Sequence, residues 1–501
     1  MRASFHRGGR RRGSAMVLFT LMLPAVLIPL VGLAIDGSRL YIVQAKLSSA
    51  VDGAALGSGR LLGTDANTTE IAGEFLDANF PTGFWGTTNL TPNITYTSSF
   101  TAHTITISAT VNVPLLFMWI FGWNHSTVAS SAVATRKETR VEMVIDRSGS
   151  MSELSSVIQT ATQFTESFIS GYDELGLVAF ASSGVVGYPT TRPYNYSPTS
   201  SGGPDTNFET TQTNGNMLTM LGDIGSNGYT NMSDGLSLAY IELQKANNRD
   251  QDPTRLNAIV LFTDGVPNAF SSYANDPSNN SLLSTSKCTN NPATAGTAST
   301  QMIGVAEGYQ DSSKPTGLYI LASSPTDTNS TAYWMALTNS PNETIGTGNL
   351  KSAVAGCTYL DPSSGAPNLG DLKQIPPKTY WGDSTSDGTV SKNSSIYGSL
   401  TYKSTEPNVR SNVALAGWNA TDNAAQRILA DTTLNVSIYV IGYTGQNGNP
   451  DTYLLKRLAN TTDSSNYNAS WQTGQYIAAS DGASLAQAFQ TVASAILRLA
   501  Q

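Results

Sequence analysis

A carboxylate and two hydroxyls follow a short apolar run at intervals of two residues. The run Val141–Ile145 leads into Asp146, Ser148 and Ser150, with Gly149 among them. In a turn after a strand, alternate side chains can converge on one point, because the glycine lets the backbone fold back on itself. Three hard oxygen donors that face one spot suit Mg²⁺, Mn²⁺ or Ca²⁺ better than zinc or copper. The alternative is an ordinary turn, which Asp and Ser also fill.

The spacing Asp-x-Ser-x-Ser resembles the first segment of the metal-ion-dependent adhesion site (MIDAS) of von Willebrand factor type A (VWA) domains. That family also has a threonine on a later loop and an aspartate that ends a buried strand. Both are present in order, because Thr230 precedes a helical run and Asp264 follows the apolar run Ala258–Thr263. The resemblance predicts a metal site whose members are Asp146, Ser148, Ser150, Thr230 and Asp264.

The resemblance also implies a role for each member. Ser148, Ser150 and Thr230 would give hydroxyl oxygens to the ion. Asp146 and Asp264 would bind it directly or through water. Mg²⁺ is the expected ion, with Mn²⁺ or Ca²⁺ as alternatives. Since few charged groups would contact the ion directly, an Asp or Glu of a protein partner would complete its coordination.

Strand and helix patterns alternate along residues 140–501. This alternation implies right-handed crossovers, so we predict an α/β fold with a doubly wound, mainly parallel, Rossmann-like sheet of the VWA type. Ligands of such sheets bind beyond the carboxyl ends of the strands, where Asp146 and Asp264 both lie. The expected strands are Val141–Ile145, Glu174–Ala181, Ala258–Thr263, Asn435–Tyr443 and Gln475–Ala479. The expected helices are Glu153–Ile169, Met232–Lys245, Ala420–Asp431, Asp451–Ala459 and Ser484–Leu499.

A large insertion, about residues 267–419 and rich in Ser, Thr, Asn, Pro and Gly, interrupts this pattern. A structureless loop of that length is improbable in a compact domain, so we expect the insertion to have some order of its own. It departs from the strand that ends at Asp264 and must emerge beside the metal. There it builds the partner surface or covers the site, unless it is only a polar decoration. Its short apolar pieces are Met302–Ala306, Leu318–Ala322 and Tyr333–Leu337.

The chain has two cysteines, Cys288 and Cys357, and both lie in this insertion. Outside the cytoplasm, a disulfide between them would close a loop of about 70 residues and stabilise the fold by roughly 4 kcal/mol in the chain-entropy model. Two cysteines alone cannot form a zinc or iron–sulfur site. The disulfide is a hypothesis that two free thiols in protein purified without reductant would contradict.

The N-terminus has the pattern of a membrane anchor. Residues 1–14 carry five arginines and no acid, and residues 15–35 carry no charge. As a helix, the uncharged run spans roughly 30 Å, which is the thickness of the hydrocarbon core of a bilayer. The arginines place the basic tail in the cytoplasm and the chain after Asp36 outside it.

A cleaved signal peptide is the competing interpretation, since Gly32, Leu33 and Ala34 offer small residues at the required spacing. The apolar run is longer than a typical signal core, however. Its helical periodicity also continues through a helical extension, residues 36–63. These observations favour a retained, single-pass transmembrane helix.

Residues 11–62 resemble the N-terminal segment of TadE/TadG-like proteins of the tight-adherence (Flp) pilus assembly system. The likeness rests on Arg-Gly, then the apolar helix, Asp36 and an Ala-rich extension around Leu47. True prepilins carry a Glu at the fifth position after the processing site, whereas Leu18 stands there when counted from Ser14. We therefore expect a permanent anchor rather than a processed prepilin.

Residues 64–139 have the pattern of a small α+β unit. A helix near Glu70–Asn79 precedes three runs of alternating polarity, which predict antiparallel strands. The runs are Asn93–Thr97, His103–Val113 and Thr127–Thr135. The connector Pro114–Trp123 is apolar enough for core, or for contact with the membrane or another pilus component, and we favour the core interpretation.

Composition and missing motifs narrow the function further. The net charge is −8, so the chain after residue 14 carries about −13 and is a poor partner for nucleic acid. None of the three histidines lies in residues 140–501, which excludes Ser-His-Asp and Cys-His catalysis and histidine-based zinc chemistry there. The sequence has no Gly-x-Ser-x-Gly elbow and no Gly-Lys phosphate loop. We therefore predict that the protein is not an enzyme.

The prediction is a bacterial, membrane-anchored, TadG-like pilus-assembly protein with its bulk in the periplasm or outside the cell. Its VWA domain would bind protein partners through the metal, which makes it a cell-adhesion or assembly element. The alternative is a surface adhesin that binds host or environmental ligands and is unrelated to pili. We expect Arg147 to face solvent and assign it no role.

Overall fold

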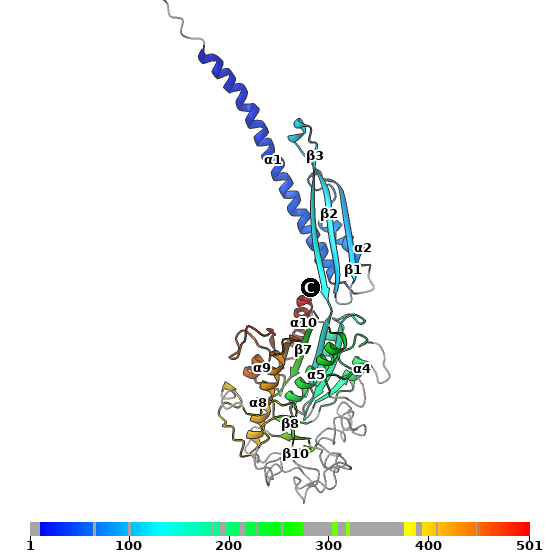
Figure 1. The fold of residues 1–501 in the computed structure, drawn as a ribbon, viewed down its shortest axis with the longest axis vertical. Coiled ribbons are helices and arrows are strands. Elements are labelled where there is room, and N and C mark those ends of the chain that lie inside the picture. The colour runs from blue at the N-terminus through cyan, green and yellow to red at the C-terminus, as the bar shows by residue number, and fades with distance from the viewer. Residues whose placement is uncertain are drawn as a thin grey trace, which may run out of the picture. The chain divides into compact units, whose positions relative to one another are not determined.

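The chain forms two compact units, one up to Lys137 and one of Glu138–Ala500 (Figure 1). We call them the N-terminal unit and the C-terminal unit. The computed structural model describes residues 11–63, 67–98, 102–182, 184–189, 197–209, 216–226, 228–251, 255–273, 303–308, 317–320, 375–386, 393–406, 409–446 and 448–500.

The N-terminal unit is built on one long helix, α1 (Arg11–Gly59), which contains the predicted transmembrane segment and residues 36–59 of the predicted helical extension. It also contains α2 (Thr68–Asn79) and a sheet in the order β1–β2–β3 with antiparallel pairing. The three strands are Thr88–Ser98, Ala102–Pro114 and His125–Lys137. Val43, Leu47 and Val51 recur along one face of α1 and pack into a core with alternate residues of β2. The observed helix and antiparallel strands agree with the α+β pattern of the sequence.

The connector between β2 and β3 corrects one prediction. It contains a short 3₁₀ helix, η2 (Met118–Phe121). Another short 3₁₀ helix, η1 (Phe84–Gly86), precedes β1. Five of its large apolar side chains are 52–64% exposed and none is fully buried, so the core interpretation is wrong. The inward-facing residues of β2 end at Val113, and the connector lies beyond them. The exposed residues are Leu116, Trp119, Ile120, Phe121 and Trp123.

A six-stranded sheet in the order β12–β11–β7–β4–β5–β6 forms the centre of the C-terminal unit. All neighbouring strands are parallel except β6, which runs antiparallel to β5. The strands are β4 (Thr139–Asp146), β5 (Glu174–Phe180), β6 (Gly184–Tyr188), β7 (Leu256–Thr263), β11 (Ser437–Tyr443) and β12 (Tyr476–Ala479). The predicted α/β class and mainly parallel sheet are therefore confirmed.

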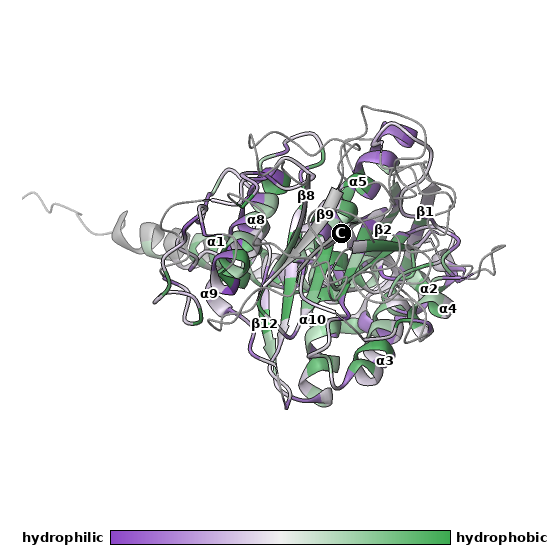
Figure 2. Ribbon diagram, turned by 90° about the horizontal axis from the view of Figure 1, so that it is seen from below, coloured by the Kyte–Doolittle hydropathy of each residue, from purple (hydrophilic) through white to green (hydrophobic). Residues whose placement is uncertain are grey.

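Helices cover both faces of this sheet because its strands are apolar on both sides. On β4, Met143 and Ile145 point into one core cluster and Val144 points into the other. The strand ribbons are largely green in Figure 2, as expected for a buried sheet. One face packs on α3 (Leu154–Thr165), α4 (Met217–Gly222) and α10 (Gly482–Leu499). The other packs on α5 (Met232–Asp250), α8 (Arg410–Leu429) and α9 (Thr452–Leu458).

The segment predicted as an insertion contains a second, antiparallel sheet in the order β10–β9–β8. Its strands are β8 (Ala269–Tyr273), β9 (Ile303–Glu307) and β10 (Gly317–Ile320). The apolar pieces Met302–Ala306 and Leu318–Ala322 overlap β9 and β10. The helix expected at Ala420–Asp431 begins earlier, at Arg410. Tyr333–Leu337, Cys288 and Cys357 lie outside the described residues.

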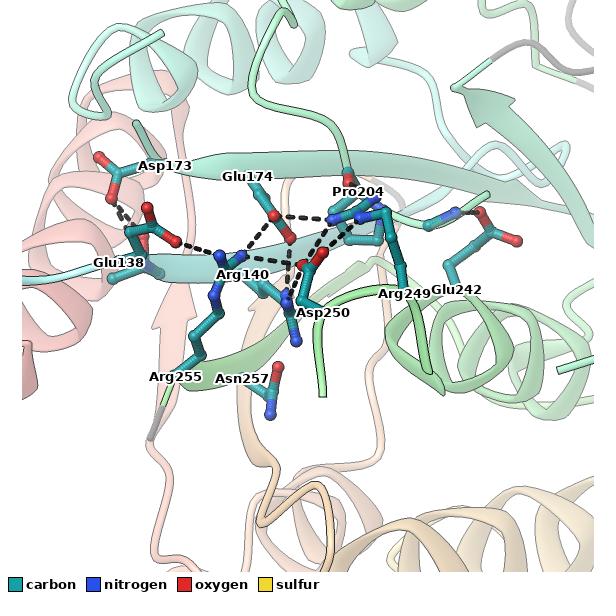
Figure 3. Close-up of polar contacts among 12 residues, drawn as sticks. Glu138, Arg140, Asp173, Glu174, Pro204, Glu242, Arg249, Asp250, Arg255 and Asn257 are labelled. Atoms are coloured by element: carbon teal, nitrogen blue, oxygen red, sulfur yellow. Dashed lines mark hydrogen bonds and ion pairs between the residues drawn. The ribbon is translucent and has the colours of Figure 1, made fainter. Parts of the chain in front are cut away.

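An ion network lies at the amino ends of the central strands (Figure 3). Arg140 Nε lies 2.6 Å from Glu174 Oε2, and Arg249 Nη2 lies 2.7 Å from Glu174 Oε1. Arg140 is fully buried and also pairs with Asp250. The network has as many carboxylates as arginines, so its charges balance. Its members are Glu138, Arg140, Glu174, Arg249, Asp250 and Arg255.

Candidate metal centre

The register of two parallel strands brings two predicted ligands to one place. β4 and β7 are neighbours in which Ile145 pairs with Phe262, so Asp146 and Thr263 follow side by side at the carboxyl edge. Thr263 Oγ1 donates a hydrogen bond to Asp146 Oδ2 over 2.6 Å. Asp264 is the next residue after Thr263, and the loop that follows starts there. The strand ends alone therefore position both carboxylates.

The turn after β4 aims its hydroxyls at Asp264. The Ser148 backbone N–H donates to Asp146 Oδ1 at 2.8 Å, which closes the turn. Ser148 Oγ lies 3.1 Å from Ser150 Oγ, and Ser150 Oγ donates to Asp264 Oδ1 at 2.8 Å. Side chains of alternate residues in the turn thus converge with the carboxylate of a second strand.

Thr230 reaches the same place from a third segment. Its backbone N–H donates to Asn268 Oδ1 at 2.7 Å, and the Asn268 N–H donates back to the Thr230 carbonyl at 3.0 Å. A Cβ added at Gly265 would lie 3.5 Å from Thr230 Oγ1 and 3.8 Å from Ser150 Oγ, so both hydroxyls flank Gly265. The structure therefore brings all five predicted residues together.

Glycine is required in the loop that carries Thr230. Gly228 has φ +91°, and a Cβ there would lie 2.8 Å from Ser182 Oγ. Its carbonyl accepts a hydrogen bond from the Gly149 N–H at 2.9 Å. The two glycines allow the β4 turn and the Thr230 loop to approach each other closely.

Within the described residues, neither of the two buried carboxylates here forms an ion pair with a basic side chain, although the buried guanidinium of Arg147 lies close enough to Asp146 to interact with its charge. Burial raises the pKa of Asp146, although hydrogen bonds from Thr263 and Ser148 act in the opposite direction. Burial, with the charge of Asp146 adding to it, raises the pKa of Asp264 to about 7. Both directions have the same physical meaning, because a buried negative charge without a cation is unfavourable. A divalent cation at this point would stabilise both ionised carboxylates.

The donor set fits a hard cation. Both oxygens of Asp146 already accept hydrogen bonds, so Asp146 would reach an ion most simply through water. The remaining donors are the hydroxyls of the site and the carboxylate of Asp264. Within the described ranges there is no cluster of three or more His, Cys, Asp or Glu side chains that could hold a metal ion, so the candidate site depends on its hydroxyls together with two carboxylates. Hydroxyl and carboxylate oxygens are the ligands that Mg²⁺, Mn²⁺ and Ca²⁺ prefer.

Arg147 corrects a further prediction, because it does not face solvent. The residue is 2% exposed, its backbone N–H donates to the Phe180 carbonyl at 2.8 Å, and its Nε donates to the Gly225 carbonyl at 2.5 Å. Burial lowers the pKa of Arg147 to about 10, while the charge of Asp146 opposes that shift. Its side chain is therefore buried within the C-terminal unit. Arg147 thus fixes the turn to neighbouring segments of the chain.

Sequence reasoning missed two supporting residues, Thr263 and Asn268. Thr263 is adjacent to Asp264, and its position opposite Asp146 follows from the parallel register. A sequence-based prediction of the parallel register could therefore have identified Thr263. Asn268 lies in a Pro-Asn pair with no motif of its own, and only the fold shows that it holds Thr230.

Family comparisons define the class of two regions. Residues 141–266 match the family model described as von Willebrand factor type A domain, and they contain all five candidate ligands. Residues 13–60 match the family model described as putative Flp pilus-assembly TadE/G-like. No curated protein matches the chain.

Several solved structures are similar to the chain at low levels. PilB minor pilin from Streptococcus sanguinis is 12% identical, with 82% of this chain and 80% of that chain covered and a TM-score of 0.35. The pilus adhesin SpaC from Lactobacillus rhamnosus GG is 11% identical, with 82% and 34% covered and a TM-score of 0.33. The adhesive tip pilin GBS104 from Streptococcus agalactiae is 12% identical, with 80% and 67% covered and a TM-score of 0.29. Similarity of this degree carries no conclusion about this chain.

Proposed function

We propose that the protein is a membrane-anchored pilus-assembly protein whose C-terminal unit binds a protein partner through a divalent ion. The convergence of three hydroxyls and two buried carboxylates at the carboxyl edge of the sheet carries the proposal. The ligands would be Asp146, Ser148, Ser150, Thr230 and Asp264, with Mg²⁺ as the preferred ion and Mn²⁺ or Ca²⁺ as alternatives.

The recognition chemistry follows from the charge of the site. An ion held mostly by hydroxyls and water keeps its positive charge largely uncompensated and can accept another carboxylate. An Asp or Glu of the partner would supply it, and this chain's residues would hold the ion at the open edge of the sheet. Such binding needs no bond to be made or broken, so the proposal is recognition rather than turnover.

The anchor is the second part of the proposal. Helix α1 is long and apolar enough to cross a membrane, and nearly all of it lies within the segment that matches the TadE/G-like family. The chain would cross once, with the arginine-rich tail in the cytoplasm and the rest in the periplasm or outside the cell. The TadE/G-like match supports a pilus component as the partner.

The segment after β7 is well placed to form the partner surface. It leaves the site through Asn268, which bonds to Thr230, and continues directly into β8. Further along, Trp381 Nε1 donates to Asp234 Oδ1 at 2.7 Å, and Ser271 donates to the same carboxylate. Asp234 belongs to the first turn of α5, which follows Thr230. These contacts join the surroundings of the ion to the predicted insertion.

Thermal unfolding of a soluble fragment, Glu138–Ala500, tests the metal site. A ligand that binds only the folded state at a hundred times its dissociation constant stabilises it by about 2.7 kcal/mol. We expect Mg²⁺, Mn²⁺ or Ca²⁺ to raise the melting temperature above that in EDTA. Asp146→Ala should abolish the rise, and Asp463→Ala, on the surface of the same unit, should preserve it. A wild-type fragment that ignores all three ions would disprove the metal mechanism.

A deletion strain tests the pilus role. Loss of pili that the wild-type gene restores and the Asp146→Ala gene does not would support assembly through the metal site. Normal pili in the deletion strain would contradict the pilus assignment and leave the surface-adhesin alternative.

A further inference from the structure

The exposed connector between β2 and β3 is held against the helix that we propose as the membrane anchor. We call residues Leu115–Trp123 the hairpin tip. The Asp36 carboxylate, which is 1% exposed, accepts hydrogen bonds from the backbone N–H groups of Leu116, Phe117 and Met118 at 2.8, 3.0 and 2.9 Å. The tip and α1 lie side by side in Figure 1.

A second contact places the tip at the last turns of the apolar segment. A Cβ added at Gly32 would lie 2.6 Å from Phe117 Cβ, so the tip packs directly on the helix backbone there. Gly32 and Asp36 are separated by about 6 Å of helix rise. Residues 15–35 form the predicted span, so the tip lies beside its final part rather than beyond it.

The tip and the helix both expose apolar side chains near their contact. Around the contact, α1 exposes Leu30, Val31 and Leu33 by 62%, 52% and 57%. Next to them the tip exposes the five large apolar residues named above. An aqueous protein surface rarely has such a patch, and lipid would remove it from water together with the helix.

The aromatic residues have the character of a membrane interface. Trp119, Phe121 and Trp123 lie in the tip, and Trp85 is 51% exposed. The Trp85 carbonyl accepts a hydrogen bond from Arg39, which lies one turn after Asp36 on α1. Tryptophan is enriched where the hydrocarbon core meets the headgroups. The tryptophans thus gather at the level where the apolar segment ends.

The backbone of the tip is prepared for an apolar environment, where an unpaired N–H group is costly. Three N–H groups of the tip donate hydrogen bonds to Asp36. In addition, the Leu115 N–H donates to the Asn124 carbonyl, and the Trp123 N–H donates to the Met118 carbonyl. Ile120 and Gly122 donate within the tip as well. Asp36 therefore acts as a positioning residue that joins the tip to the helix and satisfies its donors.

We infer that the hairpin tip inserts into the bilayer beside α1, on the non-cytoplasmic side, as a second membrane contact. The inference rests on the proposed membrane anchor. Contact at two points would restrict the tilt and rotation of the N-terminal unit at the membrane surface, which a single helix would leave free.

Tryptophan quenching by brominated lipids tests the inference on the full chain in phosphatidylcholine vesicles. Bromine on the acyl chains quenches only tryptophans that reach them. We expect brominated vesicles to reduce the emission of the wild type, and most of that loss to disappear in the double variant Trp119→Phe, Trp123→Phe. The matched control is Trp471→Phe in the C-terminal unit, which should leave the bromine-dependent loss unchanged. Phenylalanine keeps the tip apolar, so the variants preserve its surface.

Carbonate-resistant flotation with the vesicles separates the two proposals. Protein that does not float disproves the anchor of the proposed function and the tip insertion with it. Protein that floats while Trp119 and Trp123 contribute no bromine-dependent loss overturns the tip insertion alone. The patch would then face a protein partner or a second copy of this chain.

Discussion

The two edges of the central sheet bury similar charged groups and differ in how those charges are balanced. At the amino edge, Arg140 lies among Glu174 and Asp250, and arginines and carboxylates match in number. At the carboxyl edge, Asp146 and Asp264 lie near each other, and the side-chain Nε of Arg147 donates to a backbone carbonyl instead. The charged groups of the amino edge pair with one another within the chain, whereas the carboxyl edge would gain from an external cation. This difference is the reason that we propose the carboxyl edge as the binding site.

The pKa values of the carboxylates express the same contrast. Burial acts to raise the pKa of Asp250, but hydrogen bonds and charge from Arg249, with Arg140 and Arg255, hold it below its usual value. Burial raises the pKa of Asp264 to about 7, and the charge of Asp146 adds to the rise. Arginine partners therefore reverse the effect of burial at Asp250, although burial still raises the pKa of Glu138 in the same network to about 7. At Asp264 the neighbouring charge of Asp146 acts in the same direction as burial.

Arg140→Met should give the largest effect on stability. Removing this fully buried guanidinium leaves Glu174 and Asp250 short of a partner, and breaking a buried pair in this way costs about 3–5 kcal/mol. Urea unfolding of the Glu138–Ala500 fragment measures it. Lys403→Ala is the control, because its pair with Glu406 is largely exposed and should contribute less than about 0.5 kcal/mol. Equal effects of the two variants would contradict the comparison.

Asp264→Asn should stabilise the fragment when metal is removed, whereas Arg140→Met should destabilise it. At pH 8 in EDTA the buried carboxylate is ionised in the folded state, and the amide removes that charge while it still accepts the hydrogen bond from Ser150. We expect the free energy of unfolding to rise by about 2 kcal/mol. In saturating Mg²⁺ the order should reverse, because the variant loses a ligand. A variant that is less stable than wild type in EDTA would argue against an uncompensated site.

The gain from Asp264→Asn should shrink as the pH falls. Between the unfolded pKa near 3.8 and the folded pKa of about 7, the folded carboxyl keeps a proton that the unfolded one has lost. The contribution of the Asp264 carboxyl to the stability of the wild type therefore decreases as the pH rises through that window. Below about pH 4 the wild type and Asp264→Asn should differ little in stability. Unfolding in EDTA at a series of pH values measures the difference. If the increase in the free energy of unfolding caused by Asp264→Asn is the same from pH 4 to 8, it does not come from the ionisation of Asp264.

The sequence was sufficient where function depends on local spacing. Asp146, Ser148 and Ser150 lie in one turn, and the ends of two parallel strands bring Asp264 beside them. The burial of Arg147 could not be predicted, because its acceptor at Gly225 is distant in sequence and depends on the packed fold. Whether an ion occupies the site stays a prediction.

Predictions of the fold failed where a pattern has more than one physical meaning. The run Pro114–Trp123 is apolar, and hydropathy does not distinguish a protein core from an exposed surface. The edge strand β6 is short and antiparallel to its neighbour, so the alternation of strand and helix did not indicate it. The start of α8 at Arg410 was obscured by the polar composition of the segment before it.

Glu142→Met should give the smallest change in the free energy of unfolding. It tests the effect of burying a carboxyl group at a position to which we assign no role in binding. Glu142 lies in the middle of β4 between the two edges, is fully buried, and neither of its carboxylate oxygens has a hydrogen-bond partner within the part of the chain that the structure describes. Burial, with the charge of Glu242 adding to it, raises its pKa well above the usual value. Methionine has a similar shape and no polar atom to desolvate, so it should stabilise the fragment by about 1 kcal/mol.

A matched variant, Glu142→Gln, separates charge from shape. Because burial favours the neutral form of Glu142, the isosteric amide should change the stability less than methionine does. Both variants are to be compared by urea unfolding at pH 7. If methionine destabilises the fragment while glutamine is neutral, the carboxyl group takes part in a favourable polar interaction. Burial alone would then not explain why the carboxylates at the carboxyl edge destabilise the metal-free fold. Repulsion between Asp146 and Asp264 would have to account for more of that destabilisation.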